Sequence, residues 1–545
     1  MAFATNIQRP GTLALSYQEV LTAAARLRWK RQEARDAAVF RHHCRQALET
    51  GAQDARDAGY AAADIRLASF AVVAFLDETV LLASDGRFAH WVHQPLETEL
   101  FGTREADEAF YRHLRGLLAR PGDANTADLI EVYLLCLLLG FLGMYGPMTG
   151  QRRTLIQEAR EKLKGIRGPL GELSPAWRVP PAPATPVPRP PLARTAPAPD
   201  AAPVDDLMRE AEVRLPVVSG GGTLRSLPLL LVIGEPASVK TSTILHCGAS
   251  KETLAGEVYR DGNVTPTALA NLWFARPAVV VEAGATMLAD RARWCRLLEK
   301  LQPGSAAAAR AALVCVDVER LTRSDAADLA SRSAAYLRAH LEEYGQMVGT
   351  AVPIYVLFTR MDRVAGFAEF VRKLSHDEAG RVVGATLPAA FLPGDSAGAM
   401  ATRLKDAYSA LYRSLALARV ELMARESDPE KVEPAYEFPR EFHKLRPVVV
   451  RLLSELCPPG TPGAPFLRGF YFSGARPIVV EEEEPVVRPS MDVDDVSATG
   501  MFGDSVFRPS APVKAPAMRR KIPQWLFLTH LFRHVLLADY LGAPR

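Results

Sequence analysis

Residues 229–242, LLLVIGEPASVKTS, decide the fold of the second half of this 545-residue chain. The first five residues are apolar and predict a buried parallel strand, Gly234 then opens a loop, and Lys240 begins a helix. This order is typical of a phosphate-binding loop, whose pattern is G-x-x-x-x-G-K-[ST]. The chain meets the pattern except at Val239, which stands where the second glycine is expected. We therefore predict an α/β domain of P-loop-like type with one irregular loop position.

Val239 bears on whether this loop binds a ligand. Glycine lets the backbone approach a phosphate closely and adopt a positive φ, whereas a β-branched residue at positive φ is an outlier. Lys240 can still meet a phosphate, and the Thr241 hydroxyl can still coordinate magnesium. Two interpretations stay open: the loop binds Mg-ATP or Mg-GTP, or it keeps its shape without a ligand.

Three further apolar runs, 278–281, 311–316 and 353–358, predict neighbouring strands of a parallel sheet. The carboxyl ends of such strands gather at one edge of the sheet, where ligands bind. The predicted nucleotide site is built from residues at this edge: Gly234, Lys240, Thr241, Glu282 and Asp362. If a nucleotide binds, Thr241 and Glu282 would hold magnesium, and Asp362 would contact a guanine edge.

The motifs around this site are incomplete. The segment Glu282-Ala283-Gly284-Ala285 lacks the aspartate and the last glycine of D-x-x-G, and Arg360 replaces the usual lysine before Asp362. A retained fold with an eroded site fits this pattern better than a working NTPase. No catalytic residue is predicted.

The first part of the chain, from about residue 17 to 167, has apolar residues at three- and four-residue steps and predicts an all-α helical bundle. Asp77 and Glu78 are adjacent on one of its apolar helices. Neighbouring residues on a helix face different ways, so the two carboxylates cannot chelate a metal by themselves. We expect them to cap a helix end or to pair with an arginine.

The composition argues against several classes of function. The formal net charge is +3 and no long basic run occurs, so nucleic acid is not an implied partner. The six cysteines show no C-x-x-C spacing and suggest neither a zinc site nor a disulfide framework. The longest apolar run, 132–144, is shorter than the ~20 residues of a membrane helix. The start of the chain has no signal peptide pattern, so a cytoplasmic protein is expected.

Shifts in composition predict the domain organisation. The run 175–203 is rich in proline and alanine and predicts an extended spacer, so that the two halves fold independently. The expected divisions are a helical domain at 1–167, a Pro/Ala-rich linker at 168–215, a P-loop-like α/β domain at 216–392, a helical extension at 393–480, a disordered acidic and Pro-rich segment at 481–521, and a C-terminal amphipathic helix at 522–545.

Several motifs of the helical part occur together and in order: Leu76-Asp77-Glu78, Trp91 with Pro95-Leu96, Leu100-Phe101-Gly102, Leu135-Cys136 and Gly140-Phe141-x-Gly143-x-Tyr145. This combination resembles the DotU/TssL family and covers nearly all of residues 15–167. Members of that family are inner-membrane components of type VI and some type IV secretion systems, with a cytoplasmic helical domain followed by one membrane helix. In this chain the Pro-rich run stands where the resemblance would place that helix.

The second half carries a second set of motifs: the loop 229–241, Trp273-Phe274, Thr359-x-x-Asp362, Phe438-Pro439-Arg440-Glu441-Phe442, Leu467-Arg468-Gly469-Phe470-Tyr471-Phe472-Ser473, and Phe527-Leu528-x-x-Leu531-Phe532-x-x-Val535. This set resembles the cytoplasmic, NTPase-like region of IcmF/TssM and covers about 227–541, with an interruption at 481–521. The chain therefore looks like the cytoplasmic parts of TssL and TssM fused in one polypeptide.

The two resemblances imply a scaffold of a type VI secretion system that links the membrane complex to the baseplate. The implied partners are baseplate and membrane-complex subunits, and contact with the membrane would be indirect, at the cytoplasmic face of the inner membrane. Two alternatives stay open. The chain is an ATPase or GTPase switch of the same apparatus, or it is a soluble regulator that competes with membrane-anchored TssL and TssM.

Overall fold

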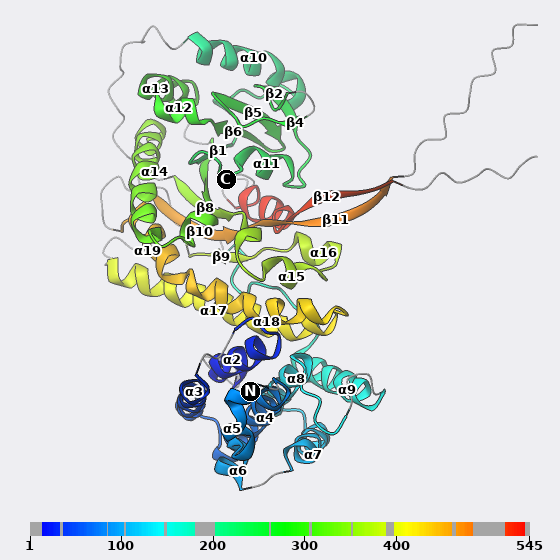
Figure 1. Ribbon diagram of the computed structural model, residues 1–545. Helices are drawn as coiled ribbons and strands as arrows, with labels where there is room; N and C mark the ends of the chain where they lie inside the picture. Colours follow the sequence, from blue (N-terminus) through cyan, green and yellow to red (C-terminus); the bar gives the residue numbers. More distant parts are fainter. Residues whose placement is uncertain are drawn as a thin grey trace, which may run out of the picture.

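The computed structural model describes residues 13–32, 36–83, 85–102, 105–145, 150–179, 202–260, 263–304, 308–349, 352–388, 397–459, 465–482 and 518–539. Figure 1 shows two bodies: a helical region formed by the start of the chain, and a larger region built on a sheet. A layer of helices from the second half of the chain lies between them. No helix in the described ranges has the length and apolar character needed to cross a membrane.

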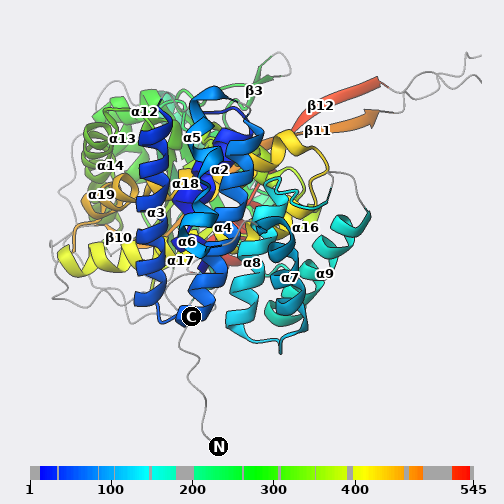
Figure 2. The ribbon, with the colours of Figure 1, turned by 60° about the horizontal axis from the view of Figure 1, so that its bottom comes forward.

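The helical region confirms the prediction that the first part of the chain is all-α. Helices α4 and α8 are its most buried members and pack on each other, because both are apolar over most of their length. Figure 2 brings this region forward and shows α3, α4 and α8 as neighbours. Its elements are α1 (Leu13–Ser16), α2 (Gln18–Arg28), α3 (Ala37–Asp57), α4 (Ala62–Leu82), η1 (Gly86–Phe88), α5 (Ala89–His93), α6 (Leu96–Phe101), α7 (Ala106–Ala119), α8 (Ala124–Leu138) and α9 (Gly150–Arg167).

An eight-stranded sheet forms the second region, with the strand order β2-β5-β6-β1-β7-β8-β10-β9. In that order the strands are β2 (Glu252–Ala255), β5 (Ala270–Ala275), β6 (Ala278–Ala283), β1 (Leu229–Gly234), β7 (Arg310–Asp317), β8 (Pro353–Thr359), β10 (Phe466–Phe472) and β9 (Gly384–Thr386). The five strands from β6 to β10 are parallel, whereas β2, β5 and β9 run antiparallel to their neighbours. The four predicted strands all form, but the sheet is mixed rather than parallel.

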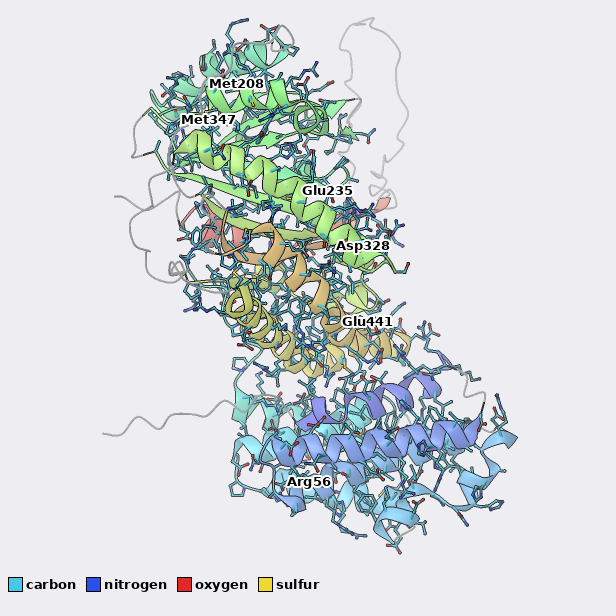
Figure 3. The ribbon with its side chains drawn as sticks, turned by 90° about the vertical axis from the view of Figure 1, so that its left-hand side faces the viewer. Arg56, Met208, Glu235, Asp328, Met347 and Glu441 are labelled. Carbon is cyan, nitrogen blue, oxygen red and sulfur yellow. The ribbon has the colours of Figure 1, made fainter. Side chains whose placement is uncertain are left out.

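Helices cover both faces of this sheet, as its continuous apolar strands require. Leu229, Leu231 and Ile233 of β1 face one core, and Leu230 and Val232 face the other. The first face carries α10 (Ala202–Ser219), α13 (Arg291–Lys300) and α14 (Ala326–Val348), and Asp328 and Met347 mark the two ends of α14 in Figure 3. The second face carries α11 (Lys240–Leu245) and the C-terminal turn η5 (Leu531–Leu536), a π-helix.

Short elements complete the sheet region. They are the hairpin of β3 (Tyr259–Arg260) and β4 (Asn263–Val264), and α12 (Ala285–Ala289), η3 (Val318–Leu321), η4 (Met361–Arg363), α15 (Phe367–Val371) and α16 (His376–Gly380).

Three long helices separate the sheet from the helical region: α17 (Ala397–Ala424), α18 (Pro429–Lys444) and α19 (Arg446–Leu456). Helices α17 and α18 contribute to two cores. Leu411 and Phe442 belong to the core of the sheet, whereas Val420, Met423 and Tyr436 belong to the core of the helical region. The two regions are therefore packed together, which differs from the expectation of two halves joined only by a flexible spacer.

The beginning of the predicted linker is packed against the sheet. Ser174 Oγ accepts the Gly384 amide at 2.8 Å, and the Thr386 amide donates to the Ala176 carbonyl at 2.8 Å. The segment 173–177 thus covers the outer edge of β9, which would otherwise expose unpaired backbone groups. The end of the predicted linker forms most of α10, which lies on the sheet. The remaining part, 180–201, lies outside the described residues.

The C-terminal divisions also differ from the prediction. The predicted helical extension contains β10 and most of β11 (Gly474–Glu482), and the predicted C-terminal helix begins as β12 (Met518–Leu526). Strands β11 and β12 pair over nine positions and project as a ribbon from the sheet region. The predicted disordered segment, 481–521, lies outside the described residues between 483 and 517, and its two ends belong instead to β11 and β12. The sequence does not indicate strands β10, β11 and β12, because the apolar patterns at 466–482 and 518–526 are too short to distinguish a strand from a helix.

Candidate functional site

The strand and the helix expected on either side of the loop after Gly234 both form. Strand β1 ends at Gly234, and α11 begins at Lys240. The Lys240 ammonium folds back and donates to the carbonyl oxygens of Gly234 at 3.1 Å and Glu235 at 3.3 Å. Ser238 Oγ donates to the Glu235 carbonyl at 2.7 Å, and Thr359 Oγ1 on β8 donates to the Ser238 carbonyl at 3.2 Å. The loop is thus closed on itself and fixed to the centre of the sheet.

Val239 adopts the backbone conformation that glycine would favour. Its φ is +49° and its ψ is +33°, in the left-handed region. Left-handed backbone costs an ordinary residue about 1–2 kcal/mol, and a β-branched residue there is a genuine outlier. Ala237 also has a positive φ, +65°. The rest of the loop therefore imposes its shape on Val239.

Thr241 and Glu282 meet directly. The Thr241 hydroxyl donates to Glu282 Oε1 at 2.8 Å and lies 3.1 Å from the Thr267 hydroxyl. The Asn271 amide donates to the second Glu282 oxygen at 3.5 Å. Burial raises the pKa of Glu282, and the hydrogen bonds from Thr241 and Thr267 and the charge of Lys240 partly offset that rise.

Lys240 is a buried cation without a close anionic partner. It is 7% exposed, and burial lowers its pKa. No carboxylate of the described residues lies within 4.0 Å of its ammonium, and the neighbouring Glu235 is instead paired with Arg320. A buried charge that contacts only neutral carbonyls is costly, and an anion at the loop would lower that cost. The lysine is therefore suited to bind a phosphate, although the carbonyl oxygens of the loop also hold it in place without one.

Asp362 is not part of this group. It lies in η4 and accepts the Ala475 amide of β11 at 3.2 Å. Arg360, before it, pairs with Asp317 at 2.6 Å and with Glu319 at 2.7 Å. The contacts of Asp362 thus tie the end of β8 to the start of the ribbon. The structure therefore brings together four of the five predicted residues: Gly234, Lys240, Thr241 and Glu282. The fifth, Asp362, contacts β11 instead.

Magnesium prefers six oxygen ligands and usually keeps several waters. Thr241 and Glu282 offer oxygens of the right kind, but they bond each other, and burial favours the protonated form of Glu282. In the described ranges, no group of three or more His, Cys, Asp or Glu side chains could hold a metal ion. The two residues could therefore hold magnesium only together with a phosphate that supplies further oxygens.

Sequence reasoning missed several polar residues around the loop. Asn271 lies in the buried strand β5, 1% exposed, and its side chain donates to Thr267 Oγ1 at 2.7 Å. Arg320, in η3, pairs with Glu235. The signal for Asn271 was available, because a polar residue in an apolar strand needs a buried partner. No local signal pointed to Arg320.

Asp77 and Glu78 have the structural roles expected for them. Asp77 accepts the Leu96 and Glu97 amides at the start of α6 at 3.2 and 2.8 Å, and the Trp91 indole at 2.7 Å. Glu78 pairs with Arg28 at 2.9 Å and accepts the Gly143 amide at 2.6 Å. Both carboxylates fix connections around α4, the first by capping a helix and the second by pairing with an arginine.

The contact between the two regions is a second candidate site. Arg26 on α2 pairs with Glu437 on α18 at 2.5 Å, and Arg440 on α18 holds both oxygens of Glu19 at 2.9 and 2.8 Å. Figure 3 labels Glu441, which also lies near Arg26, at 3.6 Å. These pairs join residues more than 400 positions apart, so no sequence pattern could have indicated them.

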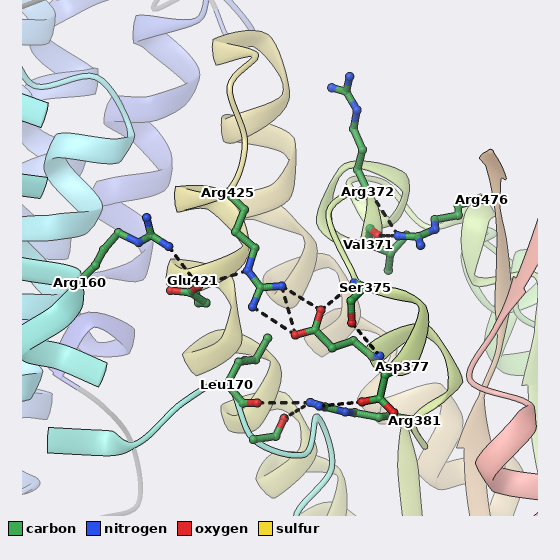
Figure 4. A network of polar contacts seen from close by, with 12 residues as sticks. Arg160, Leu170, Val371, Arg372, Ser375, Asp377, Arg381, Glu421, Arg425 and Arg476 are labelled. Carbon is green, nitrogen blue, oxygen red and sulfur yellow. Dashed lines mark hydrogen bonds and ion pairs between the residues drawn. The ribbon is translucent and has the colours of Figure 1, made fainter. Parts of the chain in front are cut away.

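A second polar network also joins the helical region to the sheet region (Figure 4). Arg160 on α9 bonds Glu421 on α17 at 3.1 Å, and Arg425 links Glu421 to Glu378 of α16. Arg381 holds the Gly171 carbonyl at 2.8 Å, at the start of the segment that covers β9. Ion pairs and backbone contacts thus fix the helical region, the covering segment and the sheet region in one arrangement.

Comparisons with known proteins agree with this division. Residues 12–201 match the family model described as type VI secretion system protein DotU, and residues 288–544 match the IcmF-related N-terminal domain. The second match begins after the loop at Gly234. The type VI secretion system component TssM1 of Pseudomonas aeruginosa is 28% identical over 316 residues, 55% of this chain. The chain covers 28% of that relative's length.

Two solved structures are also similar to part of the chain. The cytoplasmic domain of TssL from Acinetobacter baumannii is 25% identical with a TM-score of 0.27, and the match covers 29% of this chain and 99% of that one. SciP/TssL from enteroaggregative Escherichia coli 042 is 22% identical with a TM-score of 0.25, covering 28% of this chain and 89% of that one.

Proposed function

Because this single chain joins a DotU/TssL-like region to an IcmF/TssM-like region of type VI secretion systems, we propose that it is a structural component of that apparatus. The observation that carries the proposal is that two different family models match separate parts of one polypeptide. In its proposed role the chain links the membrane complex to the baseplate through protein contacts. The proposal also places the chain at the cytoplasmic face of the inner membrane, as the resemblance to DotU/TssL and IcmF/TssM implies.

The packing of the two regions supports a scaffold rather than a pair of loosely tethered modules. Val420, Met423 and Tyr436 from the second half complete the core of the first half. A body of this kind transmits position and force, because its parts cannot move separately without exposing apolar surface. Partners bound to the two regions would be held in a fixed relation.

We further propose that the loop from Gly234 to Thr241 is a degenerate phosphate-binding loop that contributes structure. The support is that its polar groups are paired within the protein: Lys240 with two carbonyls, Thr241 with Glu282, and Glu235 with Arg320. The proposed nucleotide residues Gly234, Lys240, Thr241, Glu282 and Asp362 would bind ATP or GTP weakly, and no catalysis is assigned to them.

Deletion of the gene in its own host, followed by measurement of type VI effector export, tests the proposed role. Loss of export, restored by the wild-type chain, is expected. Complementation with Glu437→Arg should fail, because Arg26 then faces a like charge, and the exchange Arg26→Glu with Glu437→Arg should restore export. Unchanged export after deletion would refute the scaffold, and increased export would favour the competing-regulator alternative.

Affinity purification of the tagged chain from the same host provides the partner test. Baseplate and membrane-complex subunits are expected in the eluate of the wild type, and the Glu437→Arg variant should recover fewer of them if both regions act as one body. Recovery of no secretion subunit by the wild type would contradict the proposal.

A further inference from the structure

The contact between the helical region and α18 contains a fully buried arginine that forms no ion pair with a carboxylate of the described residues. Arg419 on α17 is 0% exposed. One of its terminal nitrogens donates to Gln18 Oε1 on α2, while Nε and the other terminal nitrogen have no hydrogen-bond partner among the described residues. Its guanidinium also lies over the ring of Tyr436, 4.5 Å from the centroid. The cation is therefore held between one amide oxygen and one aromatic face.

Gln18 is oriented to provide that oxygen. It is 5% exposed, and its amide nitrogen donates to the Thr22 hydroxyl at 3.0 Å. This bond uses the nitrogen within α2 and leaves the oxygen facing out of the helix toward Arg419. The helical region thus presents a pre-oriented hydrogen-bond acceptor at the place where the other region presents a buried donor.

We propose that Gln18 and Arg419 form the specificity-determining contact by which this sheet region accepts a DotU-like helical domain. The surface formed by α17 and α18 fits a helical domain that offers an acceptor in the first turn of the helix packed on it. A domain with an apolar side chain there leaves a buried guanidinium without any acceptor, which weakens docking strongly. In the neighbouring pair of Arg26 with Glu437, the arginine side chain is 32% exposed, so solvent screens that charge more than it screens Arg419.

In the structure, the helical region of the same chain occupies the surface formed by α17 and α18. The segment 168–172, between α9 and the buried Leu173, connects that region to the edge of β9 and keeps it close to the docking surface. A short connection of this kind gives a high effective concentration and holds a contact closed even when one of its groups is costly to bury. The inference concerns the docking of the two regions and does not depend on the secretion role.

Hydrogen exchange of the full-length chain tests the proposal. Exchange of the amides in α2 and α18 reports docking, whereas exchange in α4 reports the folding of the helical region and exchange in β1 that of the sheet region. Gln18→Leu should raise exchange in α2 and α18 by at least about tenfold and leave β1 unchanged, because Arg419 loses its acceptor. The double variant Gln18→Leu with Arg419→Met should return exchange to within about threefold of the wild type, since the unpaired charge is gone. Gln53→Leu, on the exposed face of α3, is the matched control and should have no effect.

Gln18→Glu keeps the test decisive if the leucine variant fails to fold. A carboxylate at this position retains the acceptor and adds a charge opposite to Arg419, so exchange in α2 and α18 should be equal to or slower than in the wild type. Wild-type exchange in Gln18→Leu, failure of Arg419→Met to rescue it, or an equal loss of protection in Gln18→Glu and Gln18→Leu would each overturn the proposal.

Discussion

Tyr436 tests whether the helical region depends on a residue from the far end of the chain. This tyrosine lies on α18, is 0% exposed, and belongs to the core formed by the helices of the first half. Tyr436→Ala should therefore loosen the contact of α2 with α18, although position 436 is about 400 residues from α2.

The size of the effect follows from what the side chain does. Truncation of a large buried aromatic side chain to alanine costs about 3–5 kcal/mol. The Tyr436 hydroxyl has no partner in the described part of the chain, so its removal returns roughly 1 kcal/mol of desolvation cost. The remaining loss is about 2–4 kcal/mol, which corresponds to an increase in opening of about 30- to 900-fold.

Hydrogen exchange measured by peptide measures this quantity in α2 and α18. The matched control is Tyr408→Ala: Tyr408 is also 0% exposed, but it belongs to the core of the sheet region, where it stacks on Phe442 at 4.7 Å. The control should raise exchange around α17 and α19 and affect α2 much less. Unchanged exchange of α2 in Tyr436→Ala, or the same response of α2 to both variants, would refute the shared core.

Three further outcomes are expected. Titration calorimetry with Mg-ATP and Mg-GTP should show weak or no binding by the wild type and tighter binding by Val239→Gly, because glycine lets the backbone at this left-handed position (φ +49°) approach a phosphate closely. Micromolar wild-type binding that Lys240→Ala abolishes would contradict the degenerate loop. Burial and the nearby Asp77 carboxylate raise the pKa of Glu97 from 4.5 to about 7, so its contribution to stability should fall as the pH rises from about 4.5 to about 7. In thermal unfolding, Glu97→Gln should therefore stabilise the chain at pH 8 and not at pH 4, and equal effects at both values would argue against the shift. Glu78→Ala should destabilise the helical region by about 3 kcal/mol because Arg28 loses its carboxylate partner and two amides lose their acceptor, whereas the exposed Glu108→Ala should change the unfolding free energy by less than about 0.5 kcal/mol.

The sequence by itself determined the elements whose patterns are long and local. The apolar run at 229–233 forms β1, and the first part of the predicted helical extension at 393–480 forms α17. The adjacent position of Asp77 and Glu78 was enough to predict separate structural roles, since helix geometry alone points them apart. The change from a strand to a helix around Val239 was also predictable, because an apolar run, a glycine and then lysine and threonine follow one another locally.

Other features depend on contacts between distant segments, and local patterns carry no information about these. The strands at the edges of the sheet are short, so their pairing is decided by the neighbours they meet and not by their own periodicity. The segment 168–179 reads as a linker from its composition, but the open edge of β9 gives its backbone hydrogen-bond partners. Arg419 and Gln18 lie 401 positions apart and become a buried pair only when the two regions dock. Their roles are decided by tertiary structure because the cost of burying a polar group depends on which partner the fold places beside it.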